Sequence, residues 1–168
     1  MRILVVGSGG REHALMWALS RKGDHSIAGA PGNPGMGEIG RLFPVKADDI
    51  NGLTELARAE NVDLVVVGPE VPLVAGLADE LRAAGIPCFG PGKAAAMLEG
   101  SKWFAKEIMD AAGVPTAEGK VFSDSASAMK YISDDASRYV LKADGLAAGK
   151  GVFLPDDYAE AIAVLKEL

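Results

Sequence analysis

Cysteine is nearly absent from this sequence, because Cys88 is the only one among 168 residues. A single cysteine excludes an internal disulfide and fits a reducing compartment such as the cytosol. Cys88 lies in the apolar stretch "IPCF", which favours a buried, unreactive thiol. Long apolar runs are missing too, since none approaches the roughly 20 residues that a membrane helix needs. The amino terminus enters a strand pattern without room for a signal peptide, so we expect a cytoplasmic protein with no membrane partner.

Basic charge is also scarce. The 17 lysines and arginines are outnumbered by 23 acidic residues, which gives a net charge of -6 and a pI of about 4.9. A general nucleic-acid partner is therefore not expected, although a few local amides and lysines suffice to hold a small phosphorylated ligand. With 49% hydrophobic residues, the chain can bury an ordinary globular core. Its length suits one domain, or one domain plus part of another.

Short apolar runs alternate with helical patterns over the first hundred residues. Strands are expected at 2–7, 25–30, 63–68 and 86–90, and helices at 11–23, around 50–57 and at 73–85. The segment 31–40 is too rich in glycine and proline for regular structure. Alternating strands and helices predict right-handed crossovers, and hence a doubly wound parallel sheet with helices on both faces.

The pattern changes after about residue 100. A helix over 101–113 is predicted to begin at the N-cap Ser101 and to end at Gly113. The segment 114–123 is expected to be a linker that leads into a strand, followed by a helix over 125–133. Strands over 138–144 and 151–155 and a helix over 156–168 complete the pattern. We interpret this region as the start of a second domain.

The turn "GSGGREHA" lies between a predicted strand and a predicted helix. Gly7 and Gly9 fit a dinucleotide fingerprint, but Glu12 stands at the third glycine position and the next strand ends without an acid. Free amides at a helix N-terminus still favour an anion, so Gly9, Gly10 and Arg11 are candidates to hold a phosphate. A tight turn without any ligand is the alternative.

Glu70 follows the strongest predicted strand, in "VGPEVPL". Open α/β sheets bind ligands outside the carboxyl ends of their strands. A carboxylate at this place can accept hydrogen bonds from sugar hydroxyls, whereas the alternative is a solvated loop glutamate.

A second glycine-rich segment, "KADGLAAGKGV", lies between two predicted strands. It is not a P-loop, because Gly145 and Gly149 are one residue too close and Gly151 replaces the Ser or Thr that would bind magnesium. A strand–loop–strand setting with Lys142 and Lys150 predicts a flap that covers a polyphosphate, with backbone amides and lysines as donors. A mobile hairpin with two surface lysines is the alternative.

Taken together, these motifs resemble a known family. "GSGGREHAL", "APGNPG", "VVGPEVPLVAGLADELRAAG", "FGPGKAAAMLEGSKWFAKEIMDAAGVPTA" and "VLKADGLAAGKGV" occur in the order and spacing of the N-terminal part of phosphoribosylamine–glycine ligases, ATP-grasp enzymes of purine synthesis. The resemblance spans essentially the whole chain. It implies a pre-ATP-grasp domain over 1–100, and a linker helix with a truncated smaller ATP-grasp subdomain over 101–168.

The resemblance also implies a reaction. Glycine is activated by ATP as glycyl phosphate, and the amine of 5-phosphoribosylamine displaces the phosphate to form glycinamide ribonucleotide. Magnesium, or alternatively manganese, is expected as cofactor, with its ligands outside this chain. Because the family's chains are much longer, these 168 residues are expected to be inactive alone. The oligomeric state stays open.

Site residues follow from the same resemblance. The phosphoribosylamine site is expected to contain Gly9, Gly10, Arg11, Glu12, Pro31, Gly32, Asn33 and Glu70. The ATP site is expected to contain Lys102, Lys142, Gly145, Gly149, Lys150 and Gly151. No catalytic residue and no metal ligand is assigned. The alternatives are a sugar-phosphate or nucleotide-binding module without chemistry, another ATP-grasp carboxylate–amine ligase, and a nicotinamide oxidoreductase.

Overall fold

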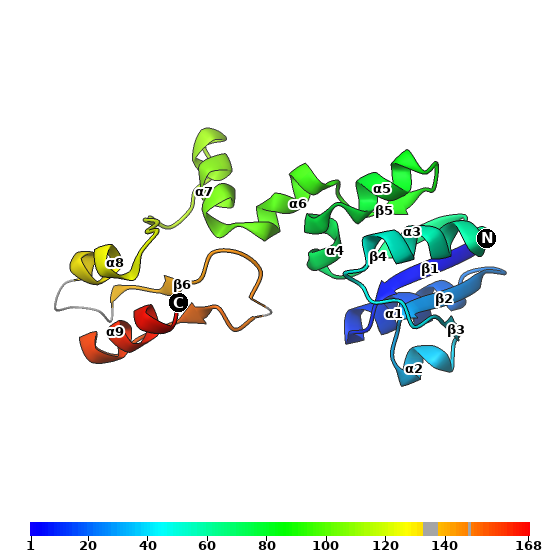
Figure 1. Cartoon of the computed structure of the whole chain (residues 1–168), viewed down its shortest axis with the longest axis horizontal. Coiled ribbons are helices and arrows are strands. Elements are labelled where there is room, and N and C mark those ends of the chain that lie inside the picture. The colour runs from blue at the N-terminus through cyan, green and yellow to red at the C-terminus, as the bar shows by residue number, and fades with distance from the viewer. Residues whose placement is uncertain (133–137, 148) are drawn as a thin grey trace. The chain divides into compact units, whose positions relative to one another are not determined.

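The structure of the protein is a computed structural model, which describes residues 1–132, 138–147 and 149–168. The chain forms two compact units, Met1–Gly100 and Ser101–Leu168 (Figure 1). The end of the predicted helix at residue 133 and position 148 of the predicted flap lie outside the described residues.

The first unit is built on a five-stranded sheet in the order β3-β2-β1-β4-β5. All of its strand pairs are parallel, which confirms the predicted parallel α/β class. The strands are β1 (Arg2–Gly7), β2 (Ser26–Pro31), β3 (Arg41–Leu42), β4 (Leu64–Val67) and β5 (Cys88–Phe89).

Helices cover both faces of this sheet, as predicted. Successive side chains of a strand point to opposite faces, so a strand buried on both sides is apolar throughout. Ile3 and Val5 of β1 pack with Met16 of the helix α1, while Leu4 and Val6 belong to the core on the other face. The helices of this unit are α1 (Gly10–Ser20), α2 (Pro34–Gly37), α3 (Ile50–Ala59), α4 (Glu70–Ala75), α5 (Leu77–Ala83) and α6 (Lys93–Gly100).

Several elements differ from the sequence prediction. The single helix expected over 73–85 is two helices, because Gly76 has a φ of 105° that breaks the helical path between α4 and α5. The segment 31–40 is not wholly irregular: the Asn33 side chain accepts a hydrogen bond from the Met36 amide and begins the short helix α2. The strand β3 and the helix α6 were not predicted.

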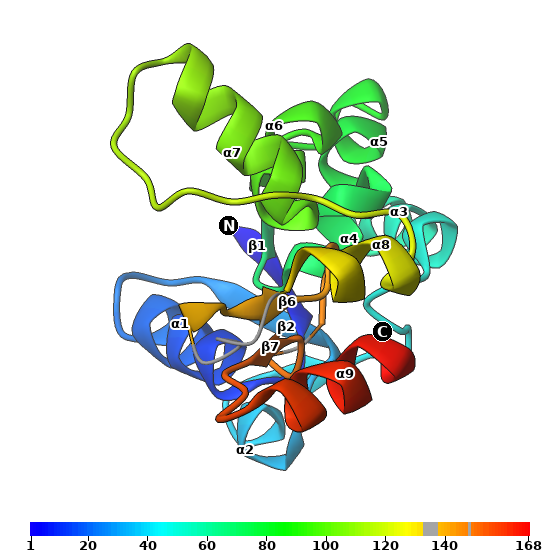
Figure 2. The same cartoon turned by 90° about the vertical axis from the view of Figure 1, so that its left-hand side faces the viewer.

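The second unit packs two helices against a short antiparallel hairpin (Figure 2). Among its described residues, the buried members of the core are Ala128, Ile132, Ala161 and Leu165. Its elements are α7 (Lys102–Ala111), α8 (Ser125–Tyr131), β6 (Leu141–Lys142), β7 (Val152–Phe153) and α9 (Tyr158–Glu167). The strand expected at the end of 114–123 is not formed, since that segment carries neither helix nor strand.

Candidate functional site

The carboxyl ends of β1, β2 and β4 lie side by side at one edge of the sheet, because these strands are parallel neighbours. The chain runs outward from β1 through β2 to β3, and then returns to the other side of β1 with β4. The turns after β1 and β4 therefore flank the topological switch point, where open α/β sheets bind their ligands. Of the eight residues predicted for the phosphoribosylamine site, Pro31 ends β2 and the other seven lie in the segments that follow these three strands.

Hydrogen bonds tie the turn after β2 to the turn after β1. The amide of Gly32 donates to the carbonyl of Gly7 at 3.1 Å. The side-chain amide of Asn33 donates to the Ser8 carbonyl at 3.0 Å. Pro31 is the last residue of β2 and pairs with Gly7 in the sheet register. The structure thus brings these two predicted groups together.

Glu12 is the buried centre of this edge, with 4% of its surface exposed. One carboxylate oxygen, Oε2, accepts the Gly9 amide at 2.7 Å. A Cβ added to Gly7 would lie 2.6 Å from Glu12 Cγ, and one added to Gly68 would lie 2.2 Å from Oε1. Gly7, which ends β1, and Gly68, which follows β4, therefore leave space that the Glu12 side chain fills.

This arrangement corrects one part of the phosphate-loop prediction. The Gly9 amide is already bound to the Glu12 carboxylate, so it is not a free donor for an anion. The carboxylate that takes this amide belongs to Glu12, which stands at the third glycine position of a dinucleotide fingerprint. A Cβ added to Gly10 would meet nothing within 4 Å, so the first turn of α1 is open at that point.

Arg11 bridges two carboxylates. Its Nε donates to Glu12 Oε1 at 3.1 Å, and its Nη1 donates to Glu70 Oε1 at 2.9 Å. The hydrogen bond to Glu70, and then that to Glu12, raise the pKa of Arg11 above its ordinary value. The hydrogen bond from Arg11, and then that from its own backbone amide, lower the pKa of Glu70. Glu70 is the first residue of α4, not a residue of a free loop.

The predicted ATP residues gather in the second unit. The ammonium of Lys102, at the start of α7, donates to the Gly145 carbonyl at 2.8 Å. Lys142 is exposed and pairs with Val152 in the hairpin. Lys150 is also exposed, and its amide donates to the Ala147 carbonyl at 2.8 Å. The motif around Lys102 and the glycine-rich hairpin are thus brought into contact.

The three glycines of this hairpin serve its own geometry. Gly145 and Gly149 have φ angles of 93° and 79°, in the left-handed region that favours glycine. Gly151 has a different role, because a Cβ there would lie 2.5 Å from the Cβ of Ala147 and 3.2 Å from that of Ala143. These observations explain the glycines without a ligand, and they are compatible with a loop that presents its backbone to one.

Asp144 was not predicted from the sequence, although it joins the two segments that were predicted to bind ATP. It accepts the Ser101 hydroxyl at 2.9 Å and the backbone amides of Lys102 and Trp103 at 2.6 and 3.3 Å. Burial acts to raise the pKa of Asp144, but these hydrogen bonds outweigh it and hold the pKa below its ordinary value. An aspartate just before a loop glycine could have suggested a cap, but not which helix it caps.

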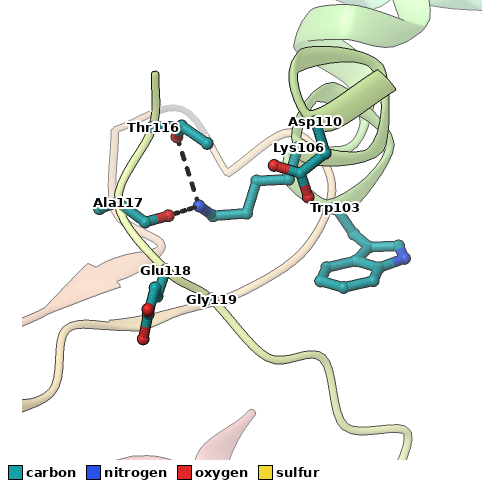
Figure 3. Close-up of a pocket in the computed structure, with 7 residues that line it drawn as sticks. All are labelled: Trp103, Lys106, Asp110, Thr116, Ala117, Glu118 and Gly119. Carbon is teal, nitrogen blue, oxygen red and sulfur yellow. Dashed lines mark hydrogen bonds between the residues drawn. The ribbon is translucent and has the colours of Figure 1, made fainter. Parts of the chain in front are cut away.

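A cavity of about 300 Å³ lies elsewhere in the second unit, between α7 and the segment 116–119 (Figure 3). Lys106 lines this cavity, and its ammonium already donates to the carbonyl of Ala117 and to the Thr116 hydroxyl. None of the predicted ATP residues lines this cavity, so it is not part of the candidate site.

The described residues contain no group of three or more His, Cys, Asp or Glu side chains that could hold a metal ion. Nor does the described part of the chain include a helix long and apolar enough to cross a membrane.

Comparison with known proteins gives the following matches. The family model "Phosphoribosylglycinamide synthetase, N domain" matches residues 1–99, and "Phosphoribosylglycinamide synthetase, ATP-grasp (A) domain" matches residues 100–168. A phosphoribosylamine–glycine ligase of Allochromatium vinosum is 48% identical over 100% of this chain, which spans 40% of that relative's length.

Solved structures match as well. The crystal structure of phosphoribosylamine–glycine ligase from Thermotoga maritima has a TM-score of 0.74 at 33% identity, over 97% of this chain and 38% of its own. Carboxyaminoimidazole ribonucleotide synthase of Aspergillus clavatus, complexed with ATP, has a TM-score of 0.71 over 99% of this chain and 44% of its own. At 22% identity, that second likeness shows the fold alone.

Proposed function

The chain belongs to the phosphoribosylglycinamide synthetase family, and we propose that it forms the amino-terminal part of a phosphoribosylamine–glycine ligase. The reaction joins glycine to 5-phosphoribosylamine and yields glycinamide ribonucleotide, ADP and phosphate. Because the chain spans only 40% of the length of the relative from Allochromatium vinosum, these 168 residues are proposed to bind ligands without completing the reaction.

The observation that carries this proposal is the contact of Lys102 with the glycine-rich hairpin. Two motifs that are far apart in the sequence meet where the Lys102 ammonium donates to the Gly145 carbonyl. With Lys142 on the adjoining strand, the second unit places two cations beside a loop rich in backbone donors. This arrangement suits the phosphates of ATP, because lysines and backbone amides neutralise phosphate charge in many nucleotide sites.

The chemistry asks mainly for positioning and charge neutralisation. The carboxylate of glycine attacks the γ-phosphate of ATP, which forms an acyl phosphate and releases ADP. The amine of phosphoribosylamine then attacks the acyl carbon and phosphate leaves. Lys102, Lys142 and the segment 145–151 are proposed to hold the phosphates of ATP, while the edge formed by β1, β2 and β4 holds the sugar substrate.

Magnesium is proposed as the metal of the complete enzyme, with manganese as a substitute. The described residues offer no cluster for it, so its ligands are proposed to belong to the rest of a protein of the relatives' length. The lone cysteine supports the cytosol as the place of action.

A nicotinamide oxidoreductase is disfavoured by Glu12. In that fold the pyrophosphate lies close to the first strand–helix turn. Here the Glu12 side chain fills the space between Gly7 and Gly68, and it takes the Gly9 amide. A dinucleotide would have to displace a buried carboxylate.

The test is to trap the acyl phosphate. A full-length protein that contains this chain, supplied with glycine and ATP, is expected to form glycine hydroxamate when hydroxylamine is added, with release of ADP. The 168-residue chain is expected to form none while still binding ATP by calorimetry. Hydroxamate formation from other amino acids but not from glycine would indicate another carboxylate–amine ligase. ATP binding without any hydroxamate in the full-length protein would favour a binding module.

A further inference from the structure

A continuous line of hydrogen bonds crosses the edge of the sheet from a buried anchor to an exposed carboxylate. The Gly9 amide donates to Glu12, Arg11 donates to Glu12 at 3.1 Å, and Arg11 donates to Glu70 at 2.9 Å. Gly9 lies in the turn after β1, Arg11 and Glu12 lie in the first turn of α1, and Glu70 begins α4, so the line spans the switch point between β1 and β4.

Burial differs strongly along the line. The side chain of Glu12 is 5% exposed, whereas those of Arg11 and Glu70 are 54% and 42% exposed. Glu12 is held by the close walls of Gly7 and Gly68 and has little freedom to move. A guanidinium presents its donors in a rigid planar fork, so fixing one edge on Glu12 fixes the direction of the other. Glu70 is thus the exposed end of an anchored arrangement.

The charges along this line favour a ligand group that donates hydrogen bonds over a ligand group that is an anion. Glu12 and Glu70 together carry two negative charges, and Arg11 supplies one positive charge, which leaves a net negative edge. Arg11 is already paired on both sides, as its raised pKa reflects. A phosphate at this point would have to compete with two carboxylates for one guanidinium. A hydroxyl or an amine would instead complete the free acceptor capacity of Glu70.

We propose that Arg11 is a positioning residue: anchored by the buried Glu12, it orients the Glu70 carboxylate toward a hydroxyl or amine of the sugar substrate. This inference rests on the proposed function, which supplies a sugar with such donors. It changes the role of Arg11 from a partner of the substrate's phosphate to a support for Glu70.

A double-mutant cycle tests the role of Arg11. Ribose 5-phosphate is titrated into the 168-residue chain, and the amide signals of Ser8 and Glu70 are followed by NMR. Arg11→Gln and Glu70→Gln are each expected to weaken binding about tenfold, as for a lost charge-assisted contact. The double variant is expected to bind like Glu70→Gln alone, because Arg11 acts through Glu70. Additive losses would overturn the proposal and make Arg11 a direct ligand.

A second measurement distinguishes an effect of Arg11 on the Glu70 carboxylate from a general loss of stability. The Glu70 carboxyl is titrated by ¹³C NMR. The pKa of Glu70, which the hydrogen bond from Arg11 lowers, is expected to rise in Arg11→Gln. Arg41→Gln removes a comparable exposed ion pair, with Glu60 at 3.5 Å, and is the matched control that leaves Glu70 unchanged. An unmoved Glu70 titration in Arg11→Gln would contradict the proposal. Arg11→Lys keeps the charge but not the fork, so it is expected to recover only part of the binding.

The choice of ligand has its own control. Inorganic phosphate in excess is expected to leave the Ser8 and Glu70 signals in place. Competition by phosphate, or the absence of any shift at Glu70 with ribose 5-phosphate, would overturn the assignment of this edge to a sugar donor. Neither result tests the proposed ligase function, which the glycine hydroxamate assay tests separately.

Discussion

Gly68 is required by a side chain far from it in the sequence. Its missing Cβ leaves room for the Glu12 carboxylate, whose Oε1 would otherwise lie 2.2 Å away. The sequence alone predicted that backbone amides of the first turn, at Gly9 and Gly10, hold a phosphate. The structure shows that the glycines at both sides of the switch point first make room for Glu12.

Gly68→Ala is therefore expected to lower the free energy of unfolding by about 1–3 kcal/mol, as in other overpacked cores. Urea unfolding is the measurement. Gly10→Ala is the matched control, because its Cβ would meet nothing within 4 Å, and it is expected to be neutral or slightly stabilising. Equal losses in both variants would contradict the role given to Glu12. In a Glu12→Ala background, the cost of Gly68→Ala is expected to shrink.

Removing the single positive charge of Lys142 tests the proposed ATP site. In the full-length protein, Lys142→Ala is expected to weaken ATP binding, or slow acyl-phosphate formation, by about 1.5–3 kcal/mol. The KM for ATP and the rate of hydroxamate formation measure the two effects. Lys130→Ala, in the last turn of α8 and outside the proposed site, is the control. Unchanged kinetics in Lys142→Ala would remove this residue from the site.

At the scale of elements, the helix α7 and the hairpin β6–β7 are joined by one capping carboxylate. Ser101 caps α7 locally by accepting the Phe104 amide at 3.1 Å. Asp144, from the hairpin, accepts two further amides of the same first turn. A carboxylate at a helix N-terminus satisfies free amides and interacts favourably with the helix dipole.

Asp144→Ala is expected to destabilise the second unit by about 0.5–2 kcal/mol, the usual cost of a lost cap. Trp103 fluorescence during urea unfolding reports this change, in a Trp17→Phe background. Asp110→Ala, near the opposite end of α7, removes an acid from the helix without removing a cap and is expected to cost nothing.

The effect of Asp144 also depends on pH in a defined direction. Its pKa is lower in the folded protein than its ordinary value, so its contribution is complete above about pH 4, the ordinary pKa of an aspartate. The contribution is lost as the pH falls through the lowered pKa. The stability difference between wild type and Asp144→Ala is therefore expected to shrink on acidification below about pH 4. A difference that stays constant down to the lowest accessible pH would contradict the hydrogen-bonded carboxylate.

At the scale of the whole molecule, the two units differ in how much apolar surface they bury. The first unit has two large clusters on the faces of its five-stranded sheet. The described residues of the second unit contribute one cluster, with four buried members, beside a two-stranded hairpin. Short two-stranded sheets with little core are marginally stable.

Hydrogen exchange of the 168-residue chain is expected to show this difference. The amides of Val5 and Val66 in the first unit should exchange by global unfolding, while those of Leu141 and Ala143 should open at lower cost. Comparable protection in both units would contradict the prediction. Added ATP is expected to slow exchange in the second unit if it binds there.

The parallel α/β class, the N-cap of α7 and the family resemblance could be predicted from the amino-acid sequence, because these depend on local patterns. Apolar runs, capping side chains and turn residues act over a few positions, and they are legible without the fold. The break at Gly76 was missed, because the apolar face continues on both sides of it while only its backbone angle departs.

Which residues contact one another across the sequence is visible only in the folded protein. Glu12, Arg11 and Glu70 come together because β1 and β4 are neighbours, although β2 and β3 lie between them in the sequence. Asp144 meets the first turn of α7 for the same kind of reason. Hydrogen bonds and steric gaps between distant segments are set by strand order and packing, which no local pattern records.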